Sequence, residues 1–179
     1  MPVSPEPRSL TIEPVARKTF APYGDLLEVS GAASNFINAG NVERFRNLTR
    51  ISVLGDSAQA CVHVYRARAP HEPIILHHME RHPRGTQLFM PLHGQAFIVV
   101  VALGSLPDYK ALRAFHVDHG RGVNIARNTW HYPLLSLVDN GDFLVVEHAD
   151  SRNNLEEYPL SIPARLVWPP STGYSNEQQ

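Results

Sequence analysis

The feature that most constrains the fold of this chain is a series of short β-type segments between residues 60 and 149. Each segment is rich in branched apolar or aromatic side chains and is bounded by a turn containing proline, glycine, asparagine or aspartate. The predicted strands cover residues 61–69, 74–82, 87–92, 95–103, 112–118, 122–127, 131–137 and 142–149. Little of this region is left for helices, so the pattern predicts an all-β sandwich or barrel. Residues 138–143, VDNGDF, carry the Asn-Gly signature of a tight hairpin.

The regions on either side of this series are less regular. Residues 10–15 fit a short strand, residues 17–24 fit a helical turn, and residues 35–50 are polar and irregular. We expect residues 1–168 to form one domain with a β/helical N-terminal appendage. The remaining residues, 169–179, are expected to be a flexible tail.

The composition narrows the class of protein. A chain of 179 residues with 43% hydrophobic side chains can bury a core, and a net charge of -1 argues against nucleic acid or an anionic membrane as a partner. The single cysteine, Cys61, leaves no internal disulfide, and the N-terminus has prolines and charges where a signal peptide has an apolar run. There is no Gly-rich phosphate loop in the sequence. We therefore expect a cytoplasmic protein without a nucleotide cofactor.

The cationic side chains suggest what the protein binds. Lysines occur only at Lys18 and Lys110, so arginine supplies the rest of the 16 basic residues. The planar guanidinium group matches the two oxygens of a carboxylate. This bias favours a small carboxylate as the ligand.

The candidate site lies in HHMERHPRGTQLF, residues 77–89. If 74–82 is a strand, alternation places His78, Glu80 and His82 on one face. Met79 and Arg81 then point the other way, together with His77. The turn Pro83-Arg84-Gly85 returns the chain beside this strand, and Gln87 follows on the next one. In a barrel, the side chains of Glu80, His82 and Gln87 would therefore project together into a pocket.

The spacing in this stretch resembles the first motif of the cupins, as Glu80-x-His82-x4-Gln87-x6-Gly94. The second cupin motif is matched in part between Gly120 and His131, where Ala126 and Asn128 replace a proline and a glycine. Asparagine suits that position because it tolerates left-handed backbone conformations. The resemblance implies an antiparallel cupin-like β-barrel, a double-stranded β-helix, with Glu80, His82, Gln87 and His131 converging at its mouth.

A closer resemblance covers the chain from about residue 20 to about residue 150. Its most specific block is E-R-H-P-x-G-T-Q-x-F-x-P, from Glu80 to Pro91. Further matching motifs, in chain order, are F-A-P-Y-G-D (20–25), I-N-x-G (37–40), V-E-R (42–44), V-V-V-A-L-G (99–104), P-D (107–108), L-R-A-F (112–115), G-V-N (122–124) and W-H-x-P-L (130–134). Together they resemble the ureidoglycolate lyases, which are cupin-like and generally dimeric. The resemblance implies cleavage of (S)-ureidoglycolate to glyoxylate and urea in allantoin and purine degradation.

The chemistry of that reaction gives the clustered residues candidate roles. Ureidoglycolate is a carbinolamide, so its collapse needs a base for the hydroxyl proton and an acid or metal that helps urea to leave. Glu80, His82 and His131 are the candidate catalytic residues. With Gln87 they are also candidate ligands of a divalent metal, manganese or nickel, the latter being the ion associated with this family. The same four groups could instead bind substrate and move protons without an ion.

Other polar residues are candidates for substrate binding. Asn38 and Asn124 could hydrogen-bond the ureido group or the carboxylate, and Arg44 or Arg81 could hold the carboxylate in a fork. Gln87 is a further candidate, and Thr86 could contribute its hydroxyl or backbone N–H. The remaining histidines are expected to be structural or exposed, apart from His78, which shares the strand face of Glu80.

Two other functions remain open at this stage, together with the oligomeric state. An amidohydrolase acting on the same substrate would release ammonia and carbon dioxide and would need an activated water. A non-catalytic cupin would bind a small carboxylate without turnover. We expect a homodimer, because the resemblance implies one and because exposed strand edges need to be covered.

Overall fold

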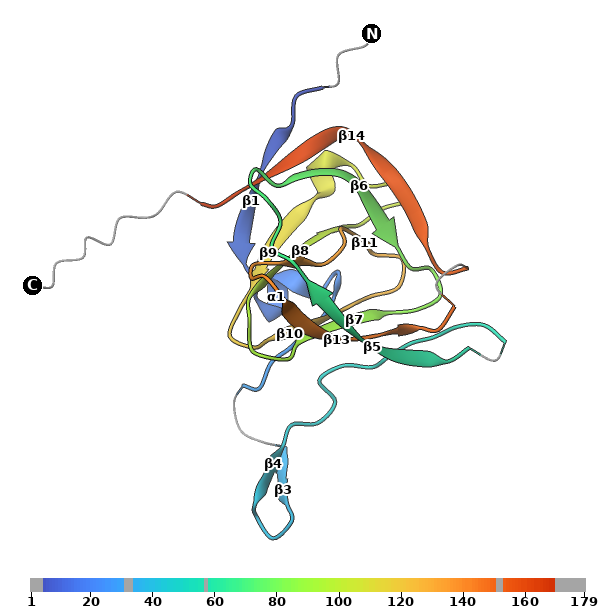
Figure 1. Ribbon diagram of the computed structural model, residues 1–179. Coiled ribbons are helices and arrows are strands. Elements are labelled where there is room, and N and C mark those ends of the chain that lie inside the picture. Colours follow the sequence, from blue (N-terminus) through green and yellow to red (C-terminus); the bar gives the residue numbers. More distant parts are fainter. Residues whose placement is uncertain (1–4, 31–33, 57, 151–152, 170–179) are drawn as a thin grey trace, which may run out of the picture.

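The computed structural model describes residues 5–30, 34–56, 58–150 and 153–169, and Figure 1 shows their arrangement. Residues 170–179 of the predicted flexible tail lie outside these ranges. The chain is folded mostly as β-strands, which confirms the predicted all-β class. None of the helical segments in the described ranges has the length and apolar character that crossing a bilayer requires.

Short strands make up most of the regular structure, with one α-helical turn and one 3-10 turn between them in the described residues. In order they are β1 Arg8–Pro14, α1 Arg17–Phe20, β2 Gly24–Leu27, β3 Asn35–Ile37, β4 Val42–Arg44, β5 Ala60–Ala67, β6 Ile75–Arg81, β7 Gln87–Pro91, β8 Phe97–Ala102, the 3-10 helix η1 Tyr109–Ala111, β9 Arg113–Val117, β10 Gly122–Ile125, β11 Trp130–His131, β12 Leu135–Ser136, β13 Gly141–His148 and β14 Glu156–Val167.

Six strands close into a barrel, as expected for a cupin-like fold. The hydrogen-bonded order is β11-β6-β14-β1-β9-β8, and a further pairing of β11 with β8 completes the ring. The pairings within the ring are antiparallel except those of β1, which runs parallel to β14 and to β9. Each of the six strands contributes buried apolar side chains to one core, among them Ile12, Leu76, Ile98, Ala114, Trp130 and Leu166. This core fills the inside of the ring.

A second sheet, ordered β2-β10-β7-β13-β5, packs against the outer face of β8 and β9. The core between them is aromatic. The rings of Phe20 and Phe115 meet edge to face at 5.5 Å, and those of Phe97 and Phe143 at 5.3 Å. Alternate residues of β8 enter the two cores, so this strand is buried on both faces. That double burial explains its unbroken apolar sequence, FIVVVA.

Two of the predicted β features are corrected by the structure. The segment 131–137 is not one strand, because β11 and β12 are separate two-residue strands and Pro133, between them, cannot donate a ladder hydrogen bond. The prediction of a hairpin at 138–143 is wrong. There β12 pairs with β8, whereas β13 pairs with β5 and β7, so the Asn-Gly turn joins two sheets.

The structure also adds elements that the sequence analysis left out. The longest strand is β14, which contains Pro159 and Pro163 and shifts its register against β6 between Pro159 and Ala164. The two prolines conceal the strand pattern in the sequence. The region 35–50 contains the two-stranded hairpin β3–β4, which projects from the body of the molecule (Figure 1).

Candidate active site

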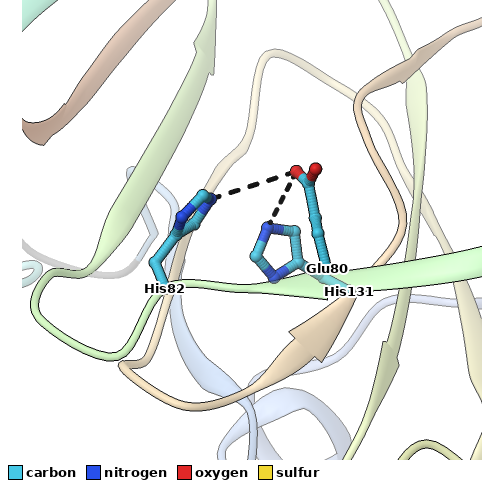
Figure 2. A group of neighbouring side chains, drawn as sticks. All are labelled: Glu80, His82 and His131. Atoms are coloured by element: carbon cyan, nitrogen blue, oxygen red, sulfur yellow. Dashed lines mark ion pairs between the residues drawn. The ribbon is translucent and has the colours of Figure 1, made fainter. Parts of the chain in front are cut away.

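The centre of the site is built by pairing β6 with β11. His131 lies directly opposite Glu80 in this antiparallel pair, so the two side chains share a face. Its neighbour Trp130 points into the core of the ring, and His131 therefore faces the second sheet. Figure 2 shows Glu80, His82 and His131 turned toward one another. Glu80 Oε1 is 3.5 Å from His131 Nε2 and 3.9 Å from His82 Nε2.

Backbone carbonyl groups fix the orientation of both imidazole rings. His82 Nδ1 lies 2.6 Å from the carbonyl oxygen of Asn154, and His131 Nδ1 lies 3.0 Å from that of Thr129. A carbonyl oxygen can only accept, so each Nδ1 carries a proton and donates it. Each ring consequently presents Nε2 toward Glu80. The Nε2 atom of His82 is buried and has no hydrogen-bond partner among the described residues.

Burial and charge shift the pKa values of Glu80 and His82. Burial lowers the pKa of His82, and the nearby His131 lowers it further, which favours the neutral ring. For Glu80, burial by itself would raise the pKa. The interactions with His131 and His82 outweigh it, so the pKa of this carboxyl lies below its ordinary value. Glu80 is therefore a carboxylate at neutral pH beside a neutral imidazole.

Gln87, from β7, adds a fourth group to the cluster. Its Nε2 donates to Glu147 Oε2 at 2.7 Å, and its Oε1 lies 3.0 Å from His131 Nε2. Lone-pair-bearing atoms of Gln87, Glu80 and the two histidines thus converge. The donor atoms of Glu80, His82 and His131 all lie within 4.8 Å of one another. Two nitrogen and two oxygen donors, one of them a buried atom without a partner, fit a divalent transition-metal ion.

The cluster opens into a cavity of about 480 Å³ between the ring and the second sheet. Its walls include Glu80, Gln87, Tyr65, Phe89 and Leu134. The cavity also contains Arg66, but that guanidinium is held by Asp142 through hydrogen bonds of 2.7 and 2.9 Å. The site therefore combines a polar end, where the cluster lies, with apolar walls, a common arrangement for small ligands.

Comparison with known proteins identifies the family. The sequence model described as ureidoglycolate lyase matches residues 7–166. A ureidoglycolate lyase from Brucella melitensis biotype 2 (strain ATCC 23457) is 44% identical over 153 residues, or 86% of this chain and 90% of that protein. One from Stutzerimonas stutzeri (strain A1501) is 38% identical over 164 residues, or 91% and 96%. One from Pseudomonas syringae pv. tomato is 38% identical over 165 residues, or 92% and 97%.

The chain belongs to the ureidoglycolate lyase family. The resemblance drawn from the sequence motifs is thereby confirmed. In this member of the family, the two cupin-like motifs are joined by a hydrogen bond from Asn128 N to the carbonyl oxygen of His82, at 3.1 Å. Asn128 has a φ of 62°, the left-handed conformation expected for a residue that replaces glycine.

Two of the residues predicted to bind substrate, Arg81 and Thr86, lie near the cluster but form hydrogen bonds with other residues. The guanidinium of Arg81 stacks 4.4 Å from the ring centre of Trp130 and donates to Glu156 at 2.6 Å. Arg81 thus points away from Glu80, as alternation predicts. The hydroxyl of Thr86 accepts from Ser52 N at 3.1 Å, which ties the segment before β5 to the turn before β7.

Three other predicted residues are not brought to the cluster. Asn38 and Arg44 are exposed on the β3–β4 hairpin, where Arg44 Nε donates to Asn35 Oδ1 at 3.1 Å. Asn124 lies beside Ile125, the residue that pairs with Gln87, and therefore faces the opposite side of the second sheet. Its amide donates to Thr49 Oγ1 at 2.7 Å. Within one chain, Asn124 anchors the segment that follows the hairpin.

Sequence analysis missed Tyr65, which lines the cavity, and Glu147, which is hydrogen-bonded to both Tyr65 and Gln87. Glu147 Oε1 accepts a hydrogen bond from the Tyr65 hydroxyl at 2.7 Å. Burial and the adjacent Glu147 raise the pKa of Tyr65, which keeps this hydroxyl protonated as a donor. A signal for Glu147 was present in the sequence. It shares a strand face with Phe143 and Val145, and a glutamate on a core-facing strand position needs hydrogen-bond partners.

The turn that carries Gln87 to the cluster depends on Gly85. A Cβ added there would lie 2.9 Å from His148 Cβ, so we expect Gly85→Ala to lower the free energy of unfolding by about 1–3 kcal/mol. Urea denaturation followed by circular dichroism measures this loss. The neighbouring Arg84 is exposed, so Arg84→Ala serves as the control and should change stability by no more than about 0.5 kcal/mol. Equal stability of the Gly85→Ala variant and the parent would contradict the steric argument.

Proposed function

We propose that this protein is a carbon–nitrogen lyase that cleaves (S)-ureidoglycolate to glyoxylate and urea. The observation that carries the proposal is the convergence of Glu80, His82, Gln87 and His131 in a chain of the ureidoglycolate lyase family, beside a small cavity that Glu80 and Gln87 line. The proteins that it resembles bear that name. The substrate is a small carboxylate, in keeping with the size and polarity of the cavity.

The reaction divides into two proton transfers around one carbon. The hydroxyl proton leaves as the C–N bond breaks and the aldehyde C=O forms, and the departing ureido nitrogen takes up a proton to give urea. Glu80, with its lowered pKa, is the proposed base for the hydroxyl proton. In a site without an ion, His131 with a proton on each ring nitrogen is the proposed donor to the leaving nitrogen. Its Nδ1 donates to Thr129, and its Nε2 faces the acceptor oxygens of Glu80 and Gln87. The neutral His82 would orient the substrate hydroxyl by accepting a hydrogen bond at Nε2.

A divalent metal ion, nickel or manganese, is proposed as the cofactor. Glu80, His82, Gln87 and His131 would hold it in place of the direct proton-transfer roles given above, with the Nε2 lone pairs of both histidines as ligands. Their buried, converging donor atoms support this assignment. When bound, such an ion would supply charge that lowers the pKa of a coordinated hydroxyl and neutralises the substrate carboxylate. The two Nδ1 hydrogen bonds to backbone carbonyls would orient the histidine ligands, as is common around metal sites.

The first prediction of this proposal concerns the products. Purified protein incubated with racemic ureidoglycolate should release urea and glyoxylate in equal amounts above the uncatalysed rate, with (S)-ureidoglycolate consumed. Glu80→Gln should lower kcat about 10²- to 10⁴-fold because it removes the proposed base. The control, Glu6→Gln, makes the same charge change at an exposed position before β1, outside the hairpin and the cavity, and should leave kcat unchanged. Ammonia and carbon dioxide in place of urea would indicate an amidohydrolase. Ligand binding without any product would indicate a non-catalytic cupin.

The second prediction concerns the metal. After treatment with a chelator, the protein should bind one Mn²⁺ or Ni²⁺ per chain in a calorimetric titration. His82→Ala should weaken that binding by at least about tenfold, since losing even a supporting partner of a metal ligand costs this much. His77→Ala removes an exposed imidazole from the same strand, β6, and should bind the ion as the parent does. No binding to the folded parent protein would eliminate the metal and leave the four groups to act on substrate directly.

We also propose a homodimer that acts in the cytoplasm. The hairpin β3–β4 forms a separate two-stranded sheet and exposes Phe36 (61%) and Val42 (40%). Such a hairpin is marginally stable without packing against another surface. Strand β5, at the edge of the second sheet, exposes Val62 and Val64 as well. A second copy of the chain would cover these apolar surfaces.

This proposal bears on the two predicted substrate ligands of the hairpin. Both residues, Asn38 and Arg44, belong to this hairpin and are exposed. The hairpin projects away from the body of its own chain (Figure 1). If they bind substrate, the hairpin of one copy must therefore reach the cavity of the other.

The proposed cytoplasmic location is in keeping with the single free cysteine, Cys61, since a reducing compartment keeps thiols free.

Light scattering after size exclusion tests the dimer. At micromolar concentration the parent should have twice the 20.0 kDa mass of the chain. Phe36→Asp should shift the mass toward that of the monomer, because it would bury a carboxylate in an apolar interface. Leu106→Asp changes an exposed apolar residue that follows β8, outside the hairpin and β5, and should leave the dimer intact. A parent that elutes as a monomer would refute the proposal.

A further inference from the structure

The carboxylate of Glu147 is hydrogen-bonded to Tyr65 and Gln87, two residues that line the cavity, but it has no part in the proton transfers proposed above. It comes from β13, and its side chain is only 13% exposed. Each of its oxygens accepts one hydrogen bond of 2.7 Å. The Tyr65 hydroxyl donates to Oε1, and Gln87 Nε2 donates to Oε2. His63 Nε2 also lies 3.7 Å from Oε1. A buried carboxylate with this set of partners is held in one place.

That placement decides which end of the Gln87 amide faces the cluster. A carboxylate can only accept, so the amide nitrogen of Gln87 must point toward Glu147. The amide oxygen is then directed the other way, to 3.0 Å from His131 Nε2. A flipped amide would set its oxygen against the carboxylate and leave two acceptors facing each other without a proton. Burial would make this arrangement costly.

We propose that Glu147 is a positioning residue that fixes Gln87 as an oxygen donor toward Glu80, His82 and His131. The inference deepens the proposed function, since it concerns the same site and the cation or substrate bound there. Glu147 acts through Gln87 and does not itself touch the reacting atoms. Tyr65 helps to hold Glu147 in place, because its hydroxyl donates to the other oxygen of that carboxylate.

The arrangement has a consequence for the charge of the site. Gln87 offers a neutral oxygen where a glutamate would add a second negative charge beside Glu80. The negative charge is held instead by Glu147, on the far side of the Gln87 amide. A site built in this way keeps an oxygen donor for a cation and repels an anionic substrate less than two adjacent carboxylates would.

Glu147→Gln provides the test, because it preserves size but allows Gln87 to adopt either amide orientation. The ¹H–¹⁵N spectrum of the parent should contain a side-chain amide signal of Gln87, identified by its absence in Gln87→Glu. In Glu147→Gln that signal should move and exchange faster with water. Mn²⁺ affinity, measured by calorimetry, should fall about 10- to 100-fold, as when the partner of a metal ligand is lost. Thermal melting verifies that each variant is folded.

A swapped double variant separates positioning from a general structural role. In Gln87→Glu combined with Glu147→Gln, an amide at position 147 can donate to a carboxylate at position 87. The hydrogen bond returns and an oxygen again faces His131, so Mn²⁺ affinity should recover to at least that of the parent. If Glu147 only supported the fold, the effects of the two single variants on the Mn²⁺ affinity would add, because no orientation would be restored.

Two further variants serve as controls for the Glu147→Gln measurements. Tyr65→Phe removes one hydrogen bond to Glu147 but leaves the bond to Gln87, so the Gln87 amide signal should persist. Glu6→Gln makes the same charge change at an exposed position before β1 and should alter neither the signal nor the affinity.

An unchanged Gln87 signal in folded Glu147→Gln would overturn the proposal, whatever the parent binds. If the parent takes up no Mn²⁺, the proposed metal is lost and the amide signal alone decides the role of Glu147. Absence of urea and glyoxylate together with the expected change of this signal would refute the proposed function only.

Discussion

Both the barrel and the site depend on the backbone pairing of the short strand β11 with its two neighbours. It pairs with β6 on one side and with β8 on the other, and this double pairing closes the six-stranded ring. The side chains of its two residues point to opposite faces of the strand. Trp130 fills the ring and carries the stacked guanidinium of Arg81, whereas His131 is placed against Glu80 on the other face. Because the side chains of a strand alternate, closing the barrel and assembling the cluster are one event.

Backbone and side-chain hydrogen bonds then fix the chemical state of the cluster. The carbonyls of Asn154 and Thr129 orient the rings of His82 and His131, and Glu147 orients the amide of Gln87. In a buried site such restraints are strong, because a misdirected donor or acceptor finds no water to replace its partner. The result is a set of lone pairs directed at one small volume, an arrangement suited to a proton or a cation. Because these restraints come from the protein itself, they lower the cost of ordering the side chains around a ligand.

Among the residues that the structure describes, the two arginines in or near this cavity are already paired. Arg66 is neutralised by Asp142, and Arg81 is engaged with Glu156 and Trp130. A carboxylate substrate therefore has to be matched by groups at the cluster or by residues of another copy. The projecting hairpin carries an exposed arginine, Arg44, next to exposed apolar side chains. In the proposed dimer, Arg44 of one copy would therefore supply a positive charge for the carboxylate of a substrate bound in the other copy.

The sequence by itself determined the all-β class, the alternation that sets Glu80 and His82 on one face, and the family, because these depend on local periodicity and on contiguous motifs. It also indicated the left-handed turn at Asn128, a property of that residue type. It could not reveal β14, whose prolines interrupt the strand pattern and whose pairing is long-range. Nor could it show that Asn124 faces away from Gln87, or that Glu147 is hydrogen-bonded to it. Those facts follow from the register between distant strands, in which a shift of one residue moves each side chain to the opposite face. Only the tertiary structure decided that register, because it alone determines which strands become neighbours.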